Sequence, residues 1–491
     1  MLQITMLGRH SQAVAALSMP EHAIPFPDDP TALFAALRDV FAGAVWLDGA
    51  AGGEFSIMAA GPREVLVTRD GQTWLTPGPA QPGAGQPRCL GGGDPLTLLA
   101  QCQAARRAVS STTPAFPPPF ASGAIGYFSY ELGRRLQGQN PARAALPDMA
   151  VGLYDGALVL DHHRRRAWLA GEPPAALGRW LADGGPGAAT PGAWRAEGPV
   201  EATPGRAGYQ QAFNRVMHYL REGDCYQINL ARRLMAPFSG DPLGVYARFR
   251  DLAGGPFAAY LDLPGGPILS GSPERFLKLR DGRVETCPIK GTRPRQSDPE
   301  ADRAVRRALL ASDKDRAENV MIVDLLRNDL GRGCQIGSVR VPALCQLESF
   351  ATVHHMVSTV TGTLRADRSA TDLLRDCLPG GSITGAPKYR AMEIIEALED
   401  GPRGVYCGAI GYIGDDGAMD TNIAIRTMTA RDGWLEYRAG GGLVIDSRGS
   451  DEFDETESKA AAFRRLVEEA SRRPGAAVTQ RLSAMARTSR R

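Results

Sequence analysis

The sequence lacks the features that mark a membrane or exported protein. It has no apolar run of about 18 residues, the length that a membrane-spanning helix needs. Its first residues, Met-Leu-Gln-Ile-Thr-Met, lack the basic region and the long apolar stretch of a signal peptide. We therefore expect a cytoplasmic protein with no membrane partner.

The sequence also has little net charge and no paired cysteines. Its 56 basic and 54 acidic side chains leave a formal charge of +2, so no excess of one sign indicates nucleic acid or an anionic membrane as a partner. The eight cysteines are scattered without a Cys-x-x-Cys pair, which favours reduced thiols over a zinc site or a disulfide framework. Any partner must therefore be inferred from particular sites.

The composition that is present indicates a large globular protein. With 43% hydrophobic and 22% charged residues in 491, the chain can bury a core spread over one to three domains. A stretch rich in Pro, Gly and Ala separates strand-like sequence from long helical patterns. We predict an N-terminal domain over 1–170, a linker over 171–206, a second domain over 207–470 and a basic, disordered tail over 471–491.

The periodicity of the second half predicts an α+β fold. Apolar residues recur at spacings of three and four over residues 212–221, 299–330, 387–399 and 454–469, which predicts helices. Strand-like runs lie between them, at 276–288 and 405–413. Because strands and helices do not alternate regularly, antiparallel sheets are favoured over a parallel βαβ sheet.

An Asp-Gly pair at 281–282 lies between strand-like arms and predicts a tight hairpin with Arg280 opposite Arg283. This register brings Glu274 of one arm opposite Ile289 of the other, beside Lys290. A strict ladder would place the two on opposite faces, but Pro288 cannot donate to the ladder and predicts a bulge or a strand end. The alternatives are an acid and a lysine that meet in a site, or a surface ion pair of little energetic weight.

Two predicted helices each carry a pair of carboxylates on one face. Asp315 and Glu318 lie at i and i+3, and Glu452 and Glu455 repeat this spacing in the last helix. Four carboxylates on two helices can share one hard cation, since Mg²⁺ takes oxygen ligands. The alternative is two solvated helix faces, with Glu455 paired to Lys459.

A glycine-rich loop over 379–388 runs into a predicted helix, with Pro387 suited to the helix's first turn. Free N–H groups at a helix start, together with Ser382, Thr384 and Lys388, make a candidate anion site. The glycine spacing matches a nucleotide P-loop, but Ala-Pro replaces the required Lys-Ser/Thr, so that interpretation is rejected. A plain tight turn is the remaining alternative.

His354 and His355 are adjacent and suggest a metal site. Neighbouring residues of a helix or a strand do not share a face, and no third ligand lies nearby in the sequence. We expect one of them to be a buried polar histidine.

Six segments resemble motifs of one known family, in the family's order. They are 222–230 (Glu-Gly-Asp-Cys-Tyr-Gln-Ile-Asn-Leu), 272–276 (Ser-Pro-Glu-Arg-Phe), 317–325, 381–388 (Gly-Ser-Ile-Thr-Gly-Ala-Pro-Lys), 425–427 and 439–455. The family is that of the chorismate-utilising enzymes, which includes anthranilate synthase component I, aminodeoxychorismate synthase component I, and the isochorismate and salicylate synthases. A weaker likeness covers 45–58, where the family's Leu-Asp-Ser is Leu47-Asp48-Gly49.

The resemblance implies a fold and a set of site residues. The fold would be a β-sandwich core of large antiparallel sheets with helices packed outside. Glu274 would be the general acid and Lys290 a covalent nucleophile. Mg²⁺ would lie between Glu318 and Glu455, with Asp315 and Glu452 in supporting roles. The residues that would bind chorismate are Gln227, Thr292, His355, Ser382, Thr384, Lys388, Tyr406, Arg426, Gly441 and Gly442.

Two positions distinguish the branches of the family. Isochorismate and salicylate synthases carry a lysine that activates water where this chain has Gln227, so the resemblance implies ammonia as the nucleophile. Anthranilate synthases typically have Pro-Ile-Ala-Gly-Thr where this chain has Lys290 in Pro-Ile-Lys-Gly-Thr, which matches the branch that makes 4-amino-4-deoxychorismate for 4-aminobenzoate and folate.

Two alternatives remain at this point: an anthranilate synthase component I, and a non-catalytic chorismate-binding regulatory subunit. Because no Cys-His-Glu glutaminase fits in the sequence, we expect ammonia to come from a separate glutamine amidotransferase subunit.

Overall fold

The computed structural model describes residues 23–49, 51–78, 85–107, 119–182, 189–350 and 353–472. The predicted basic tail therefore lies outside the described residues from 473 onward. Two large sheets, of 13 and 12 strands, form the centre of the described chain, and every strand pair in them is antiparallel. The predicted α+β class with large antiparallel sheets is confirmed.

The first sheet runs, in spatial order, through β1 (Ala23–Ile24), β10 (Arg166–Gly171), β9 (Gly156–Asp161), β3 (Phe55–Ala59), β2 (Val45–Asp48), β14 (Phe257–Leu261), β15 (Ile268–Ser272), β24 (Thr427–Arg431), β25 (Trp434–Leu443), β13 (Gln227–Gly240) and β11 (Trp194–Ala196). Two short strands, β12 (Glu201–Thr203) and β21 (Gly385–Ala386), also pair with β13. β13 is thus shared by several segments far apart in sequence.

The second sheet runs through β18 (Ile289–Pro294), β20 (Val353–Thr363), β17 (Arg283–Thr286), β16 (Arg275–Arg280), β23 (Met419–Ile423), β22 (Ala409–Gly414), β7 (Gly123–Phe128), β8 (Met149–Tyr154), β4 (Glu64–Arg69), β5 (Gln72–Pro77) and β6 (Arg88–Gly91), with β19 (Arg340–Ser349) paired to β20. The two sheets pack face to face: Val45 and Ile57 of the first share one buried cluster with Ile125 and Ile410 of the second.

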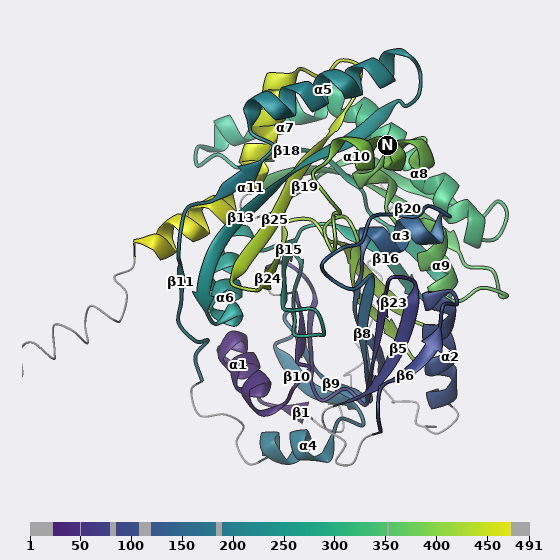
Figure 1. Ribbon diagram of the computed structural model, residues 1–491, viewed down its shortest axis with the longest axis vertical. Helices are drawn as coiled ribbons and strands as arrows, with labels where there is room; N and C mark the ends of the chain where they lie inside the picture. Colours follow the sequence, from purple (N-terminus) through teal and green to yellow (C-terminus); the bar gives the residue numbers. More distant parts are fainter. Residues whose placement is uncertain are drawn as a thin grey trace, which may run out of the picture.

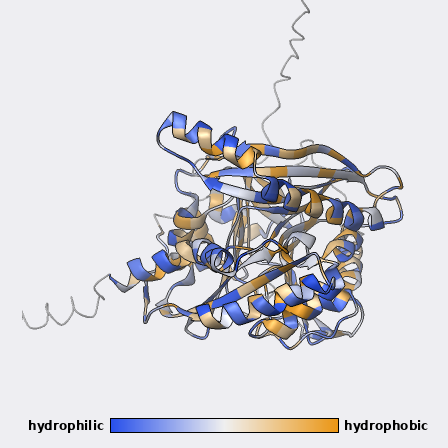
Figure 2. Cartoon of the chain, turned by 90° about the horizontal axis from the view of Figure 1, so that it is seen from above, coloured by the Kyte–Doolittle hydropathy of each residue, from blue (hydrophilic) through white to orange (hydrophobic). Residues whose placement is uncertain are grey.

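Helices cover the outer faces of this sandwich (Figure 1). They are α1 (Pro30–Val40), α2 (Pro95–Arg107), α3 (Tyr130–Leu136), α4 (Ala175–Ala182), α5 (Arg206–Arg221), α6 (Pro242–Ala253), α7 (Pro299–Leu310), α8 (Asp313–Gly333), α9 (Ala370–Cys377), α10 (Lys388–Leu398), α11 (Gly449–Ser471) and the one-turn 3₁₀ helix η1 (Gly381–Ile383). α1, α6 and α11 pack on the first sheet, and α2, α8 and α9 on the second. Figure 2 shows that these helices mix hydrophilic and hydrophobic residues, as expected for helices with one buried face.

The predicted domain boundary marks a change in residue composition, but strands from both sides of it pair within each sheet. β2 of the first part pairs with β14 of the second, and β7 pairs with β22 along six residues. The predicted linker over 171–206 contains α4, β11 and β12, and the last two extend the first sheet at β13. Composition does not reveal this arrangement, because strand pairing depends on backbone hydrogen bonds between distant segments.

Two local predictions can be compared with the structure. The hairpin at 281–282 is confirmed, with Arg280 opposite Arg283 and both turn residues at positive φ (50° and 74°). The single helix predicted over 299–330 is wrong, because the chain forms α7 and α8 with a break at Ala311 and Ser312. The Ser312 hydroxyl accepts a hydrogen bond from the Asp315 N–H and so starts a new helix.

No helix of the described chain is long and apolar enough to cross a membrane.

Because both sheets combine strands from the two parts, we predict that residues 207–472 do not fold alone. This fragment would expose the edges of β14 and β22 and would lose the partners of its inter-sheet core. Urea unfolding followed by circular dichroism should show one cooperative transition for the whole chain and none for the fragment. Co-production of residues 1–206 as a second chain should restore a soluble complex, whereas a cooperative transition of the fragment by itself would contradict the prediction.

Candidate active site

Glu274 is a buried acid that can keep its proton near neutral pH. It lies between β15 and β16, is 6% exposed, and its carboxyl accepts hydrogen bonds from the Ile289 N–H and the Ser382 hydroxyl (3.3 Å). Burial raises the pKa of Glu274 to about 7, although the nearby Lys290 ammonium lowers it. A surface ion pair is therefore excluded, and the position suits a general acid.

The hairpin ladder does not itself bring these two residues together. It ends at the pair Lys278 and Glu285, and the chain is then interrupted at Pro288, as that proline predicted. From Ile289 the strand continues as β18 against β20. The interruption turns Ile289 toward Glu274 and removes the conflict over which face each side chain occupies.

Lys290 is half-buried, and its ammonium has a lowered pKa. Burial lowers the pKa of its ammonium, with Lys459 acting in the same direction and Glu318 and Glu274 opposing it. The next residue, Gly291, lies at a bulge with φ of 72°, and a Cβ there would come within 3.0 Å of the Asp315 carboxyl carbon. Only glycine fits this bulge, so the backbone at Lys290 is closely constrained.

Three of the four predicted metal-binding carboxylates converge between α8 and α11. A Cβ on Gly441 of β25 would lie 3.3 Å from Glu452 Oε2 and 3.4 Å from Glu455 Oε1. Burial, together with the charges of Glu452 and Glu455, raises the pKa of Glu318. Glu452 is 2% exposed and accepts a hydrogen bond from the Ser447 hydroxyl (2.7 Å). The alternative of two solvated faces is thus wrong for Glu452.

Two lysines lie among these carboxylates. Lys314 Nζ lies 3.4 Å from Glu452 Oε1 and 3.9 Å from Glu318 Oε1, and Lys459 Nζ lies 2.7 Å from Glu455 Oε1. The ion pair of Glu455 with Lys459 that the sequence suggested is therefore present. Among the described residues, no group of three or more His, Cys, Asp or Glu side chains forms a metal site.

The fourth carboxylate, Asp315, is directed elsewhere. It accepts a hydrogen bond from Arg293 Nη2 (2.8 Å) and lies against Gly291. An i, i+3 spacing places Asp315 and Glu318 on one helix face, but it does not decide that their carboxylates turn to the same neighbour.

The glycine-rich loop contributes one side chain to the site. Ser382 of η1 donates to Glu274. The Thr384 hydroxyl donates to Gly380 O (2.9 Å), within the loop, and Lys388 Nζ donates to Asp329 Oδ2 (2.8 Å) and Cys377 O (3.1 Å). The structure therefore does not bring the Thr384 hydroxyl or the Lys388 ammonium to the Glu274 group, because both groups hold the loop in place.

The helix start after this loop also differs from the prediction. α10 begins at Lys388, so Pro387 is its N-cap residue and does not lie in the first turn. Pro387 makes no side-chain capping bond. Its extended backbone, with φ of −63° and ψ of 139°, suits the position before a helix.

The adjacent histidines separate as predicted. His354 is fully buried and its imidazole contacts the Asp302 carboxylate (2.9 Å) and the Ser349 hydroxyl (2.8 Å), away from the site. His355 Nδ1 is 2.8 Å from the Thr292 hydroxyl. Burial and the nearby Arg426 guanidinium lower the pKa of His355 to about 4, so its imidazole is neutral at pH 7.

Gln227 is a residue of the site whose buried side-chain amide lacks partners among the described residues. It is fully buried, and among the described residues neither its amide oxygen nor its amide nitrogen has a hydrogen-bond partner. A Cβ on Gly442 would lie 3.1 Å from Gln227 Cδ. A buried amide without partners is costly, so this position indicates a polar group that arrives with a ligand.

The sequence reasoning missed the part played by Lys459. It was considered only as a surface partner for Glu455, yet its ammonium also donates to Gly440 O (2.9 Å) and lowers the pKa of both Glu274 and Lys290. The i, i+4 spacing from Glu455 was the available signal. The position of Lys459 beside Lys290 follows from packing of α11 on β25.

Comparisons with known proteins agree with this geometry. A family model described as chorismate binding enzyme matches residues 42–465. Aminodeoxychorismate synthase component 1 of Klebsiella aerogenes is 47% identical, over 82% of this chain and 88% of its own. Anthranilate synthase component 1 of Thermus thermophilus is 40% identical, over 72% of this chain and 78% of its own. Among solved structures, anthranilate synthase component I from Streptococcus pneumoniae superposes with a TM-score of 0.71 at 28% identity, covering 84% of this chain and 92% of its own.

The raised pKa of Glu274 predicts a pH-dependent cost to stability. Its ordinary pKa is 4.5, so between that value and about 7 the folded protein holds a proton that the unfolded chain releases. The free energy of unfolding therefore falls as pH rises through this window, by about 3 kcal/mol, and then levels off. Glu274→Gln lacks this loss, so urea midpoints should show it more stable than wild type at pH 8 and nearly equal at pH 4.5.

The control is Glu300→Gln, which replaces an exposed acid in the first turn of α7. Its stability relative to wild type should not change between the two pH values. An equal difference between Glu274→Gln and wild type at both pH values would contradict the assignment of Glu274 as a buried acid with a raised pKa.

Proposed function

The chain belongs to the family of chorismate-binding enzymes, and on that premise we propose that it is the chorismate-converting component of an aminodeoxychorismate synthase. It would replace the C4 hydroxyl of chorismate with an amino group from ammonia and release 4-amino-4-deoxychorismate and water. The observation that carries this proposal is the half-buried Lys290 near the buried Glu274, one with a lowered and the other with a raised pKa.

In the first step Lys290 attacks chorismate. Its neutral amine adds to C2, the ring double bonds shift, and the bond from C4 to the hydroxyl oxygen breaks. Hydroxide is a poor leaving group, so Glu274 donates its proton and the oxygen departs as water. The products of this step are a C2 adduct on the Lys290 nitrogen, which carries the positive charge, and the Glu274 carboxylate.

In the second step ammonia attacks C4. The double bonds shift back, the bond from C2 to the lysine nitrogen breaks, and the lysine leaves as a neutral amine. The new C4 ammonium then gives one proton to the Glu274 carboxylate, which restores the acid for the next cycle. Atoms and charges balance, and the enolpyruvyl group of chorismate stays intact.

Several groups would hold the substrate carboxylates. Arg426 and Tyr406, with the backbone at Gly441 and the loop of Ser382, would hold the enolpyruvyl carboxylate. The pKa of His355 is low, so its neutral imidazole, bonded to Thr292, can accept or donate a hydrogen bond without adding charge.

The carboxylates of α8 and α11 would hold a divalent cation in place of the ammonium groups of Lys314 and Lys459 that now contact them. Two observations support this. A Cβ on Gly441 would lie within 3.4 Å of oxygens of Glu452 and Glu455, so these carboxylates lie close together. Burial and the charges of these two neighbours also raise the pKa of Glu318. Glu318 and Glu455 would hold Mg²⁺, with Glu452 in support. The bound ion would neutralise and orient the ring carboxylate of chorismate.

Gln227 supports ammonia as the nucleophile. A carboxamide cannot take a proton from water near pH 7, whereas its free oxygen can accept a hydrogen bond from ammonia. The ammonia would come from a separate glutamine amidotransferase subunit. The name "component 1" of the related proteins supports a partner of some kind.

Anthranilate synthase is the second candidate, because relatives with that name are also similar to this chain. Lys290 favours the first candidate. A reaction that ends with nitrogen on C2 needs no enzyme nucleophile there, whereas amination at C4 needs two displacements. A neutral lysine beside the acid supplies the first.

The products test this choice directly. Purified protein with chorismate, Mg²⁺ and ammonium should give 4-aminobenzoate by chromatography only when aminodeoxychorismate lyase is added. Lys290→Ala should reduce the rate by a factor of roughly 10³ or more, since it removes the nucleophile. Lys278→Ala, on β16 outside the site, is the matched control and should keep its activity. Anthranilate as the main wild-type product would refute the assignment.

The cation can be tested without an activity assay. Glu318→Gln should weaken Mg²⁺ binding in calorimetry by roughly tenfold or more, because it removes one charged ligand. Asp324→Asn, an exposed acid on the same helix, should bind Mg²⁺ as the wild type does. Equal Mg²⁺ affinity in Glu318→Gln and wild type would rule out this site.

A further inference from the structure

Arg403 is a buried guanidinium next to the site that the proposed reaction does not use. It lies in the turn between α10 and β22, and its side chain is 1% exposed. The guanidinium donates to Ile383 O (2.9 Å), to Asn229 O (2.7 Å) and to both carboxylate oxygens of Glu399 (2.6 and 2.9 Å). Four of its five N–H donors are thus directed at backbone oxygens and at a carboxylate inside the protein.

These acceptors belong to the segments that surround the substrate position. Ile383 follows Ser382, which donates to Glu274, and Asn229 pairs with Gly442 across the β13–β25 ladder. Asn229 also binds the loop directly, through its Nδ2 to Ile383 O (3.0 Å). One guanidinium therefore fixes the spacing between the Ser382 loop and the glycine strand.

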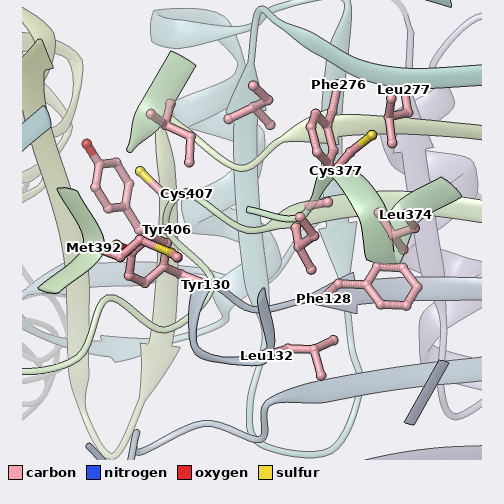
Figure 3. Close-up of a cluster of buried hydrophobic side chains, with 14 of the residues drawn as sticks. Phe128, Tyr130, Leu132, Phe276, Leu277, Leu374, Cys377, Met392, Tyr406 and Cys407 are labelled. Atoms are coloured by element: carbon pink, nitrogen blue, oxygen red, sulfur yellow. The ribbon is translucent and has the colours of Figure 1, made fainter. Parts of the chain in front are cut away.

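Arg403 also contacts two aromatic side chains, Tyr130 of α3 and Tyr406 of its own turn. Its guanidinium carbon lies 4.7 Å from the ring centre of Tyr130 and 5.7 Å from that of Tyr406. Figure 3 shows Tyr130 and Tyr406 close together, next to Met392 and Cys407. Tyr406 is therefore positioned by the same group that holds the loop.

The turn itself is held by the N-terminal part of the chain. Glu131 of α3 accepts hydrogen bonds from the backbone N–H groups of Arg403 and Gly404, each at 2.8 Å, with one carboxylate oxygen for each. The Tyr130 N–H donates to Gly404 O (2.9 Å). α3 begins at a Ser129 cap, so the position of Glu131 in the helix is well defined.

The ion pair between Arg403 and Glu399 adds geometric definition. Glu399 is 2% exposed, and its Oε1 also accepts a hydrogen bond from the Ala231 N–H (2.8 Å). A buried pair of this kind contributes little net stability compared with apolar packing, which suits a role in fixing geometry.

We propose that Arg403 is a positioning residue of the active site, which sets the distance between the Ser382 loop, the Gly442 strand and Tyr406, and that Glu131 of the N-terminal part fixes the turn that carries it. This inference rests on the proposed function for the roles of the substrate-side residues. It assigns to the N-terminal part of the chain a share in shaping the chorismate site.

The inference predicts a specific kinetic effect. Arg403→Lys keeps the charge but loses the fork that reaches the loop and the strand together. Glu131→Gln keeps the shape but places an amide N–H₂ against a backbone N–H. Because a displaced pocket wall weakens binding of substrate and transition state alike, KM for chorismate should rise roughly tenfold while kcat changes less than about twofold.

The control is Arg134→Lys. Arg134 lies on the same helix as Glu131, its side chain is 6% exposed, and it donates to Glu396 (2.5 Å) and Gln139 (2.7 Å), neither of which contacts the site. It should lose thermal stability to a similar extent and keep its KM. Amide hydrogen exchange of residues 381–386 should rise in Arg403→Lys and Glu131→Gln and stay unchanged in Arg134→Lys.

The outcomes separate this inference from the proposed function. If the wild type converts chorismate but both variants keep KM and exchange, the positioning role is wrong and the proposed function stands. If the wild type does not convert chorismate but exchange rises as described, the proposed function is wrong and the structural role of Arg403 stands. Should Arg403→Lys fail to fold, Glu131→Gln alone decides.

Discussion

The antiparallel pairing of β13 with β25 is the constraint from which the site is built. It runs from Ile228 opposite Leu443 to Pro237 opposite Trp434 and sets Gln227 beside Gly442. The glycines leave room on this ladder for the carboxylates of α11, and α11 itself packs along β25. β21 joins the open end of β13 and brings the glycine-rich loop with it. Without this ladder, Glu274, Gln227 and the carboxylates of α11 would not be held close to one another.

Exclusion of water shifts the pKa values on which the proposed reaction depends. Burial moves the pKa of Glu274 upward and that of Lys290 downward, because each charged form loses its hydration. Both shifts bring the two pKa values closer together than those of free glutamate and lysine in water. The same burial costs stability, which the surrounding sandwich core must offset.

Several features could be predicted from sequence, and each has a local cause. The Asp-Gly turn at 281–282 needs only positive φ, and Pro288 interrupts its strand because it has no N–H. The convergence of Glu318 with Glu455 was expected from spacing and from family resemblance. Thr384 and Lys388 lie near the site in sequence, yet their polar groups bind Gly380 and Asp329. Side-chain direction in a loop depends on which acceptors the rest of the fold brings within reach.

The sequence by itself determined the residue types, their local spacing and the likeness to one family. These were enough to indicate antiparallel sheets, a general acid, a nucleophilic lysine and paired carboxylates. Only the tertiary structure decided that both sheets are shared by the two parts of the chain. It also decided that Asp315 turns to Arg293 and that Arg403 joins the loop, the strand and α3. The reason is physical: strand pairing, burial and the resulting pKa shifts depend on which distant segments exclude water together, and no local pattern records that.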